Sequence, residues 1–311
     1  MTAQRTFLWL MGGIVALLVV ASVVGWLLHR RAGGGSATID NLNARIRAWW
    51  VMVAVLAACF ELGATATVIL FALASIFALR EFVTLTPTRP ADHMPLVACF
   101  YIMLPLQYGL ILDDWYGLFA IFLPVYGFLS LPVLMALAGD TEQFLERVTK
   151  LQWGVLICVY CISYVPAILL LKTHGGVDER LLLMIFLLIV VQISDVLQYV
   201  FGKLFGKHPI APRVSPAKTV EGLLGGGLSA IAIGTALYVI TPFTPAQAAA
   251  LSALIVATGF LGGLALSAAK RSLGAKDWGS MIEGHGGVLD RLDSVSFAAP
   301  VFFHACRYFF F

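Results

Sequence analysis

The sequence predicts an all-α, polytopic integral membrane protein with about nine or ten transmembrane helices. Of its 311 residues, 60% are hydrophobic and only 12% are charged, whereas soluble domains carry about 25% charged residues. A soluble fold of this length could not bury so much apolar surface, so lipid must cover it. Repeated apolar runs, each long enough to cross about 30 Å of hydrocarbon, support the same conclusion.

These apolar runs define the predicted helices in chain order. The first, 7–28, ends at His29-Arg30-Arg31 and is longer than a signal-peptide core, so we expect a retained anchor. The stretch 49–80 is too long for one straight helix and contains Glu61 and Gly63. It therefore forms either two short helices, 49–62 and 64–80, or one long tilted helix. The remaining runs are 94–112, 115–138, 151–171, 181–201, 220–240, 246–267 and 294–311.

The connections between the runs divide the chain into three parts. Residues 1–48 form an N-terminal transmembrane anchor and a cytoplasmic linker, because Gly-Gly-Gly-Ser at 33–36 predicts a flexible chain. Residues 49–180 form a transmembrane helical region, in which 141–150 is expected to lie along the membrane interface. Residues 181–311 form the third part, which contains two polar loops, 194–222 and 267–294.

Basic residues predict the orientation of the chain. The loops 202–219 and 268–293 are both basic, and the short connection 241–245 between the intervening runs carries no charge. The two loops must therefore share one side, and the positive-inside rule makes that side cytoplasmic. If 49–80 crosses twice, all but four of the twenty Lys and Arg residues lie in cytoplasmic loops, which favours ten spans over nine. The absence of an organelle-targeting sequence fits a bacterial inner membrane. The four exceptions are Arg5, Lys172, Arg180 and Arg307.

The first polar loop has the features of an anion site. Asp195 interrupts an apolar helix near its cytoplasmic end, and Ser215 and Lys218 precede the next helix. Backbone N–H groups and the helix dipole at such a position favour a phosphate, and Lys218 adds a full charge. The alternative interpretation is a basic loop that binds anionic lipid headgroups.

The second polar loop combines acidic and basic residues with glycines. Carboxylates suit Mg²⁺, which takes one or two of them and leaves room for phosphate and water, and fixed cations suit a nucleoside triphosphate. Glycines beside His285 allow a backbone to approach a ligand closely. The alternative is a set of surface salt bridges. The residues concerned are Asp277, Asp290, Asp293, Lys270, Arg271, Lys276, Arg291, Gly286 and Gly287.

The spacing in these loops resembles a known family. The second loop reads Ser267-x2-Lys270-Arg271-x4-Lys276-Asp277, followed by His285-Gly286-Gly287-x2-Asp290-Arg291-x-Asp293. This pattern is similar to the signature of phosphatidate cytidylyltransferases (CDP-diacylglycerol synthases). The upstream Ser215-Pro216-x-Lys218-Thr219-x-Glu221-Gly222 resembles another motif of that family. The resemblance is detailed over 190–300 and general over 1–180, where Arg80-Glu81-Phe82 follows a helix.

The resemblance implies a metal-dependent reaction at the cytoplasmic face, in which CTP and phosphatidate give CDP-diacylglycerol and diphosphate. Residues 181–311 would then be a catalytic transmembrane domain. The implied partners are CTP, phosphatidate or a similar lipid phosphate, and the bilayer, without nucleic acid; a homodimer is left open. The implied cofactor is Mg²⁺ or another divalent cation. The expected metal ligands are Asp290, with Asp277, Asp293 and Asp195 assisting. The expected catalytic residues are Lys270, Arg271, Lys276, His285 and Arg291, and the expected substrate-binding residues are Ser215, Lys218, Ser267, Gly286 and Gly287.

This sequence departs from the family pattern in one respect that matters for metal binding. The family has Gly-Asp-Leu shortly before the Lys-Arg pair, and this chain has Gly262-Gly263-Leu264. Asp195, Asp277 or Glu283 could replace the absent carboxylate. Two alternatives to an active enzyme follow: a weakly catalytic or altered-specificity paralogue that binds CTP or lipid phosphate, and a non-enzymatic transporter. A transporter is disfavoured, because no internal repeat is visible.

Overall fold

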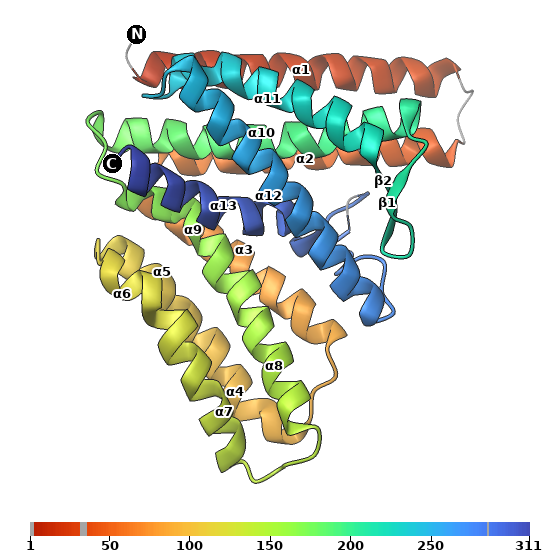
Figure 1. Cartoon of the computed structure of the whole chain (residues 1–311). Coiled ribbons are helices and arrows are strands. Elements are labelled where there is room, and N and C mark those ends of the chain that lie inside the picture. The colour runs from red at the N-terminus through yellow and green to blue at the C-terminus, as the bar shows by residue number, and fades with distance from the viewer. Residues whose placement is uncertain (1–2, 32–35, 285) are drawn as a thin grey trace.

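The computed structural model describes residues 3–31, 36–284 and 286–311, and these residues are mainly helical (Figure 1). Nine helical segments in the described part are long and apolar enough to cross a membrane. A further helix, α13, begins with a charged turn at the second polar loop. The predicted all-α polytopic class is therefore confirmed. The first helices are α1 (Ala3–Arg31), α2 (Ala37–Glu61) and α3 (Ala64–Leu85), and the last are α10 (Gly176–Phe205), α11 (Gly227–Ala236), α12 (Pro245–Ser272) and α13 (Leu289–Phe309).

The middle of the chain forms three long helical rods, each made of shorter pieces joined by a wider, π-helical turn. The rods cover Pro90–Leu112, Tyr116–Leu137 and Phe144–Leu170. Their α-helical parts are α4 (His93–Ala98), α5 (Leu104–Leu112), α6 (Tyr116–Ile121), α7 (Phe128–Leu137), α8 (Phe144–Val155) and α9 (Ile162–Ala167). Their wider turns are Cys99–Met103, Phe122–Gly127 and Leu156–Cys161.

Prolines in the second rod free backbone carbonyls that the third rod then binds. Pro124 and Pro132 have no N–H to donate to the carbonyls of Ala120 and Phe128, one turn earlier. Tyr160 donates its hydroxyl to the Ala120 carbonyl at 2.8 Å, and the Gln152 side chain donates to the Phe128 carbonyl, also at 2.8 Å. Because lipid offers no hydrogen bonds, these contacts satisfy groups that would otherwise be unpaired in the hydrocarbon region.

Three helix boundaries can be compared with those expected from the sequence: one decides between two expected versions, and two differ from the expectation. The stretch 49–80 divides at Leu62-Gly63 into α2 and α3, as the two-helix version expected, and Gly63 has a φ of +97°, which is easily reached only by glycine. The expected interfacial segment 141–150 is wrong as a separate element. From Phe144 onward it is the start of the Phe144–Leu170 rod, and α2 similarly extends into the expected linker as far back as Ala37.

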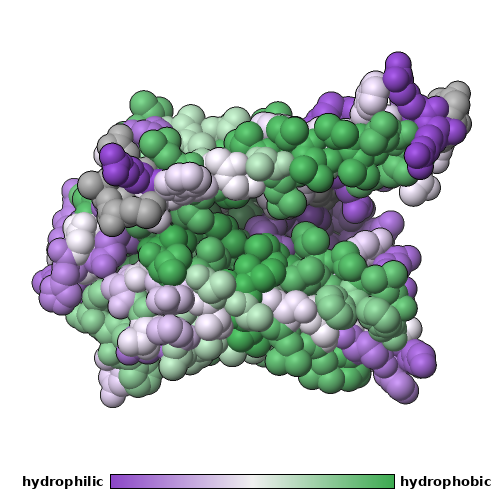
Figure 2. All heavy atoms as spheres, turned by 90° about the horizontal axis from the view of Figure 1, so that it is seen from above, coloured by the Kyte–Doolittle hydropathy of each residue, from purple (hydrophilic) through white to green (hydrophobic). Residues whose placement is uncertain are grey.

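The basic connections gather at one end of the helices, on the right and lower right in Figure 1. Arg45 near the start of α2 donates to the Gly284 carbonyl at 2.9 Å, and Arg147 in α8 binds Asp92 at 2.7 Å. The short antiparallel hairpin of β1 (Pro209–Ala211) and β2 (Ser215–Thr219) lies at the same end. Figure 2 shows the hydrophobic band between hydrophilic ends and a hollow with hydrophilic residues inside it. The basic loops therefore share one end, as their charge predicted.

Replacing Arg147 by alanine is expected to destabilise this end strongly. The side chains of Arg147 and Asp92 are 4% and 5% exposed, and Arg147 also donates to the Glu142 carbonyl at 2.7 Å. Removing one partner of a buried pair costs about 3–5 kcal/mol, because the other charge stays buried alone. Thermal unfolding in detergent measures the loss. The matched control is Lys150→Ala, which breaks the exposed pair with Glu146 and should cost about 0.5 kcal/mol or less. Equal shifts for both variants would contradict the prediction.

Candidate active site

The two polar loops meet at the shared end. Arg271, at the C-terminal end of α12, donates through Nε to the Val214 carbonyl in the hairpin turn at 3.4 Å, and through a second nitrogen to the Ala275 carbonyl at 3.0 Å. Glu221 closes the base of the hairpin by accepting from the backbone N–H groups of Lys207 at 3.0 Å and His208 at 3.2 Å. The Lys207 hydrogen bond, followed by that from the His208 ring, lowers the pKa of Glu221 to about 2. The loops are thus held against each other.

Lys218 lies next to the position where the family carboxylate is absent. Its ammonium donates to the Phe260 carbonyl at 3.2 Å and lies 4.8 Å from the centre of the Phe260 ring. A Cβ on Gly263 would stand 2.6 Å from the Lys218 Nζ and 3.3 Å from the Ser294 Oγ. Burial lowers the pKa of Lys218, and the charges of Asp293 and Asp195 oppose that shift. The space of the absent side chain is therefore filled by an ammonium group.

Asp195 and Asp293 are brought together from two helices, α10 and α13. Ser294 donates its hydroxyl to Asp195 at 3.0 Å, and its backbone N–H donates to Asp293 at 2.8 Å. The two carboxylates interact electrostatically with each other, with Lys218 and with Arg291. Within the described residues, the buried Nε of Arg291 has no hydrogen-bond partner. We call this pair of acids the carboxylate pair site, and the two cations lie beside it.

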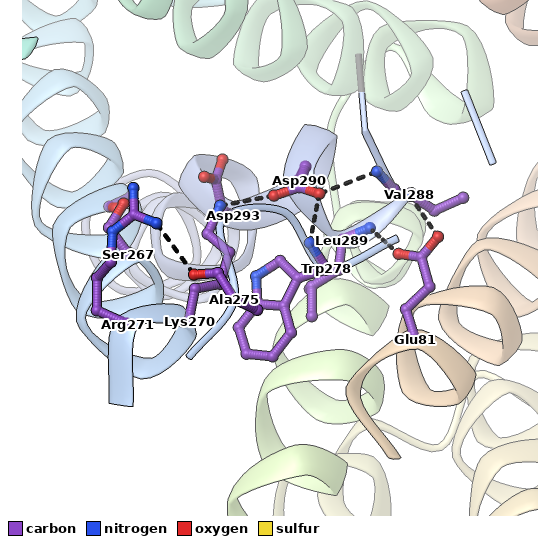
Figure 3. A network of polar contacts seen from close by, with 12 residues as sticks. Glu81, Ser267, Lys270, Arg271, Ala275, Trp278, Val288, Leu289, Asp290 and Asp293 are labelled. Carbon is purple, nitrogen blue, oxygen red and sulfur yellow. Dashed lines mark hydrogen bonds and ion pairs between the residues drawn. The ribbon is translucent and has the colours of Figure 1, made fainter. Parts of the chain in front are cut away.

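Asp290 joins three segments of the second loop (Figure 3). One carboxylate oxygen binds the Lys270 ammonium at 2.6 Å, and the other accepts from the backbone N–H groups of Trp278 at 2.7 Å and Gly287 at 2.9 Å. The side chains of Lys270 and Asp290 are 11% and 3% exposed. Asp290 therefore links α12 to α13 through the loop between them. Its expected role as a metal ligand stays a prediction, and its oxygens already have three donors.

The glycines of the second loop allow the close approach that their sequence predicted, but the partner is protein. Gly286 has a φ of +81°, and a Cβ there would lie 2.8 Å from an Asp290 carboxylate oxygen. Only glycine combines that backbone conformation with that contact. A Cβ on Gly287 would lie 2.3 Å from a Glu81 oxygen. Binding of substrate by these glycines stays a prediction.

The remaining predicted residues are dispersed around these contacts. Lys276 and Asp277 are exposed, and Ser267 donates to the Gly263 carbonyl of its own helix at 2.6 Å. Ser215 is half-buried at the start of β2. The expected role of His285 falls outside the described residues. Of the three possible replacements for the absent carboxylate, Asp195 is bound to Ser294, which itself lies next to Gly263. Asp277 is exposed, and Glu283 pairs with Arg47 of α2 at 3.0 Å.

Glu81 is a residue of this network that the motif analysis did not assign. It comes from α3, and its two oxygens accept from the backbone N–H groups of Val288 and Leu289, each at 2.9 Å (Figure 3). The neighbouring Phe82 packs against Trp278 with ring centres 5.4 Å apart. The available signal was an acidic residue near the end of an apolar helix, within Arg80-Glu81-Phe82. Such a residue is expensive in a membrane unless it has a partner.

Comparison with known proteins identifies the family to which the chain belongs. The sequence model described as the cytidylyltransferase family matches residues 43–309, from α2 to the end of α13. The chain belongs to the cytidylyltransferase family. The family resemblance of the motifs is thereby confirmed, and the match leaves α1 outside it. An integral membrane nucleotidyltransferase is the class of protein that this membership and the apolar helices support.

Individual relatives within the cytidylyltransferase family differ in how much of the chain they cover. "Uncharacterized protein YnbB" of Escherichia coli (strain K12) is 37% identical over 305 residues, which cover 95% of this chain and 96% of that protein. "Phosphatidate cytidylyltransferase" of Aquifex aeolicus (strain VF5) is 33% identical over 195 residues, covering 62% of this chain and 69% of that protein. The protein of the same name from Mycobacterium leprae (strain TN) is 45% identical over 153 residues, 46% of each chain. This chain thus spans about half of that last relative's length.

Proposed function

We propose that this chain is a phosphatidate cytidylyltransferase, which converts CTP and phosphatidate to CDP-diacylglycerol and diphosphate. The observation that supports it most is the meeting of the two polar loops at one end of the helices. There, acidic and basic side chains gather beside an apolar surface that lipid can cover. Relatives named phosphatidate cytidylyltransferase match 46% and 62% of the chain. The basic loops favour a cytoplasmic site.

The proposed reaction depends more on neutralising the charge of the phosphates than on transferring a proton. An oxygen of the lipid phosphate forms a bond to the α-phosphorus of CTP. The bond between that phosphorus and the bridging oxygen to the β-phosphorus breaks, and its electron pair leaves with diphosphate. Because the lipid phosphate is already anionic, no general base is required to create the nucleophile. Positioning and neutralisation of charge therefore supply most of the rate increase.

The carboxylate pair site fits a divalent cation of the Mg²⁺ type. Mg²⁺ is usually held by one or two protein carboxylates and completes its shell with water and substrate phosphates. Asp195 and Asp293, linked through Ser294, supply such a pair. No three His, Cys, Asp or Glu side chains of the described residues form a cluster of metal ligands, so water and phosphate oxygens would complete the shell. Bound there, the cation would neutralise phosphate charge. Asp290 and Asp277 remain the ligands that the motif alone suggests.

The exposure and the contacts of each basic side chain suggest its proposed role. Lys218 is part-buried beside the carboxylate pair site and would hold a phosphate close to the reacting phosphorus. Arg271 and Lys276 are exposed at the entrance and would bind the outer phosphates of CTP and release them as diphosphate. Lys270 is occupied by Asp290, so its contribution would be to hold α12 and α13 together.

A direct assay tests the proposal. Purified protein in detergent is given radiolabelled CTP and phosphatidate, with Mg²⁺ or with a chelator, and the lipid product is separated. We expect CDP-diacylglycerol only with Mg²⁺. Absence of a CDP-lipid at high protein concentration would reject the proposed activity.

The ammonium beside Gly263 favours a second candidate, a cytidylyltransferase with another lipid phosphate as acceptor. Lys218 fills the place of the family carboxylate, which changes the charge next to the substrate phosphates. The same assay with a polyprenyl phosphate or lysophosphatidate in place of phosphatidate distinguishes this candidate. A higher kcat/KM for one of these acceptors would support it, and a clear preference for phosphatidate would reject it.

A Gly263→Asp variant is expected to lower the Mg²⁺ concentration for half-maximal activity by roughly tenfold, which corresponds to about 1.4 kcal/mol. The new carboxylate would adjoin Lys218, whose flexible end can move aside from the 2.6 Å contact. It would also add negative charge near Asp195 and Asp293. A Mg²⁺ titration of activity measures the change. The isosteric Gly263→Asn variant is the control and should show no such gain. An unchanged titration in Gly263→Asp would show that the absent carboxylate does not limit metal binding.

A further inference from the structure

The first two turns of α13 carry two acids of the site, Asp290 and Asp293, yet no neighbouring residue in the sequence caps the start of this helix. Val288 precedes the helix and makes no side-chain cap hydrogen bond. The N–H groups of a helix start need acceptors when they are removed from water. Here the acceptors come from α3, about 207 residues earlier in the chain: the Glu81 carboxylate accepts from the backbone N–H groups of Val288 and Leu289. One charged side chain from a distant helix therefore caps the start of α13.

Glu81 also determines the shape of the loop that leads into α13. A Cβ on Gly279 would lie 2.7 Å from one Glu81 oxygen, and a Cβ on Gly287 would lie 2.3 Å from the other. Both loop segments thus pass so close to the carboxylate that a Cβ at either position would displace the Glu81 side chain. Phe82, the next residue of α3, packs against Trp278 of the same loop. Two neighbouring residues at the end of α3, Glu81 and Phe82, therefore both contact this loop.

The consecutive N–H groups of residues 287–289 divide between two carboxylates. Gly287 donates to Asp290, at 2.9 Å, while Val288 and Leu289 donate to Glu81 (Figure 3). Asp290 is in turn paired with Lys270 of α12. Moving the start of α13 would therefore move Asp290 and, one turn along, Asp293. Hydrogen bonds to a charged acceptor are stronger than neutral ones, so Glu81 is suited to fix this position.

We propose that Glu81 is a positioning residue of the active site: its carboxylate holds the backbone N–H groups of Val288 and Leu289. This contact fixes Asp290 against Lys270 and places Asp293 beside Asp195 and Lys218. This role rests on the proposed cytidylyltransferase function. Glu81 itself touches backbone N–H groups, so it acts through α13 rather than on the substrate. Substitution should reduce kcat more than it changes the KM for CTP, because the misplaced groups are those that act on the reacting phosphates.

The main test is Glu81→Gln, which keeps the size of the side chain. It replaces one carboxylate oxygen by an amide NH₂ group, which cannot accept a hydrogen bond from the backbone N–H that it faces. We expect kcat to fall about tenfold or more and the KM for CTP to change less than threefold. Hydrogen exchange in the peptide containing Val288 and Leu289 should become faster. Glu81→Asp keeps the charge and should retain an intermediate kcat. The control is Glu146→Gln, at an exposed pair on α8, which should leave both measurements unchanged.

A double substitution tests the geometry separately. Gly287→Ala should reduce kcat strongly in the wild-type background, because its Cβ meets the Glu81 carboxylate, and much less in a Glu81→Ala background, where that space is empty. Gly109→Ala, whose Cβ would meet nothing within 4 Å, is the control. Additive effects of the two substitutions would overturn the proposed contact.

The outcomes separate this proposal from the proposed function. Unchanged kcat and exchange in Glu81→Gln would overturn the positioning role. A loss of activity that merely follows the loss of folded protein would also overturn it, because it would show general destabilisation. If the wild-type protein made no CDP-lipid, the proposed function would fail, while the exchange rates would still decide whether Glu81 fixes the start of α13.

Discussion

An Asp290→Ala variant is expected to lose CDP-diacylglycerol formation by about 1,000-fold or more and to unfold at a lower temperature. The substitution removes the acceptor for Lys270 and for two backbone N–H groups at once. Breaking a buried ion pair costs about 3–5 kcal/mol, because the remaining charge is left alone. A similar loss of transition-state stabilisation corresponds to roughly a thousandfold in rate. Activity and thermal unfolding of the same preparation measure both effects.

A second substitution separates the structural part of this effect. Lys270→Met added to Asp290→Ala removes the unpaired ammonium, so it should recover part of the thermal stability. It should not recover activity, because the link between α12 and α13 remains broken. Asp277→Ala, at an exposed acid, is the control for stability. Wild-type activity in Asp290→Ala would refute both a metal-binding and a positioning role for this residue.

Replacing either member of the carboxylate pair site should produce the other large effect. Asp293→Asn and Asp195→Asn are each expected to reduce activity by about 100-fold or more at fixed Mg²⁺, and to raise the Mg²⁺ concentration for half-maximal activity. Each amide keeps the size of the side chain but removes the charge that a hard cation requires. Rates over a range of Mg²⁺ concentrations measure the two changes together.

Two further variants show which acids hold the metal. Ser294→Ala removes the hydroxyl that binds Asp195 while keeping both charges, so its effect should be about tenfold smaller than that of either aspartate. Asp277→Asn should change the Mg²⁺ requirement little, because that side chain is exposed. A larger effect at Asp277 than at Asp195 would favour the ligand set that the motif alone suggests.

The fold was largely predictable from the sequence because a membrane helix must satisfy its own backbone hydrogen bonds, so each apolar run other than 49–80 corresponds to one helical segment. The division at Leu62-Gly63 was visible as an interruption, although the sequence left two versions open. The error at 144–150 has a physical reason. An amphipathic segment reads the same whether it lies on the membrane surface or packs its apolar side against other helices, as Val148 and Leu151 do here.

The site was predictable only in part. Motif spacing indicated which residues would gather, and the two loops do meet. It did not indicate that Asp290 would be bound by Lys270, or that Glu81 would cap a helix 207 residues later, because such pairs are set by the packing of distant helices. The sequence likewise showed that a carboxylate is absent at Gly263, but only the structure shows that the Lys218 ammonium fills the space.

The proline-containing rod Tyr116–Leu137 limits which helical segments can be exchanged with those of a homologue. Its carbonyls at Ala120 and Phe128 depend on Tyr160 and Gln152 of the following rod, so these helices cannot slide or rotate past each other without stranding a polar group in lipid. A chimera that imports one of the two segments from a homologue should assemble poorly unless it imports the other as well.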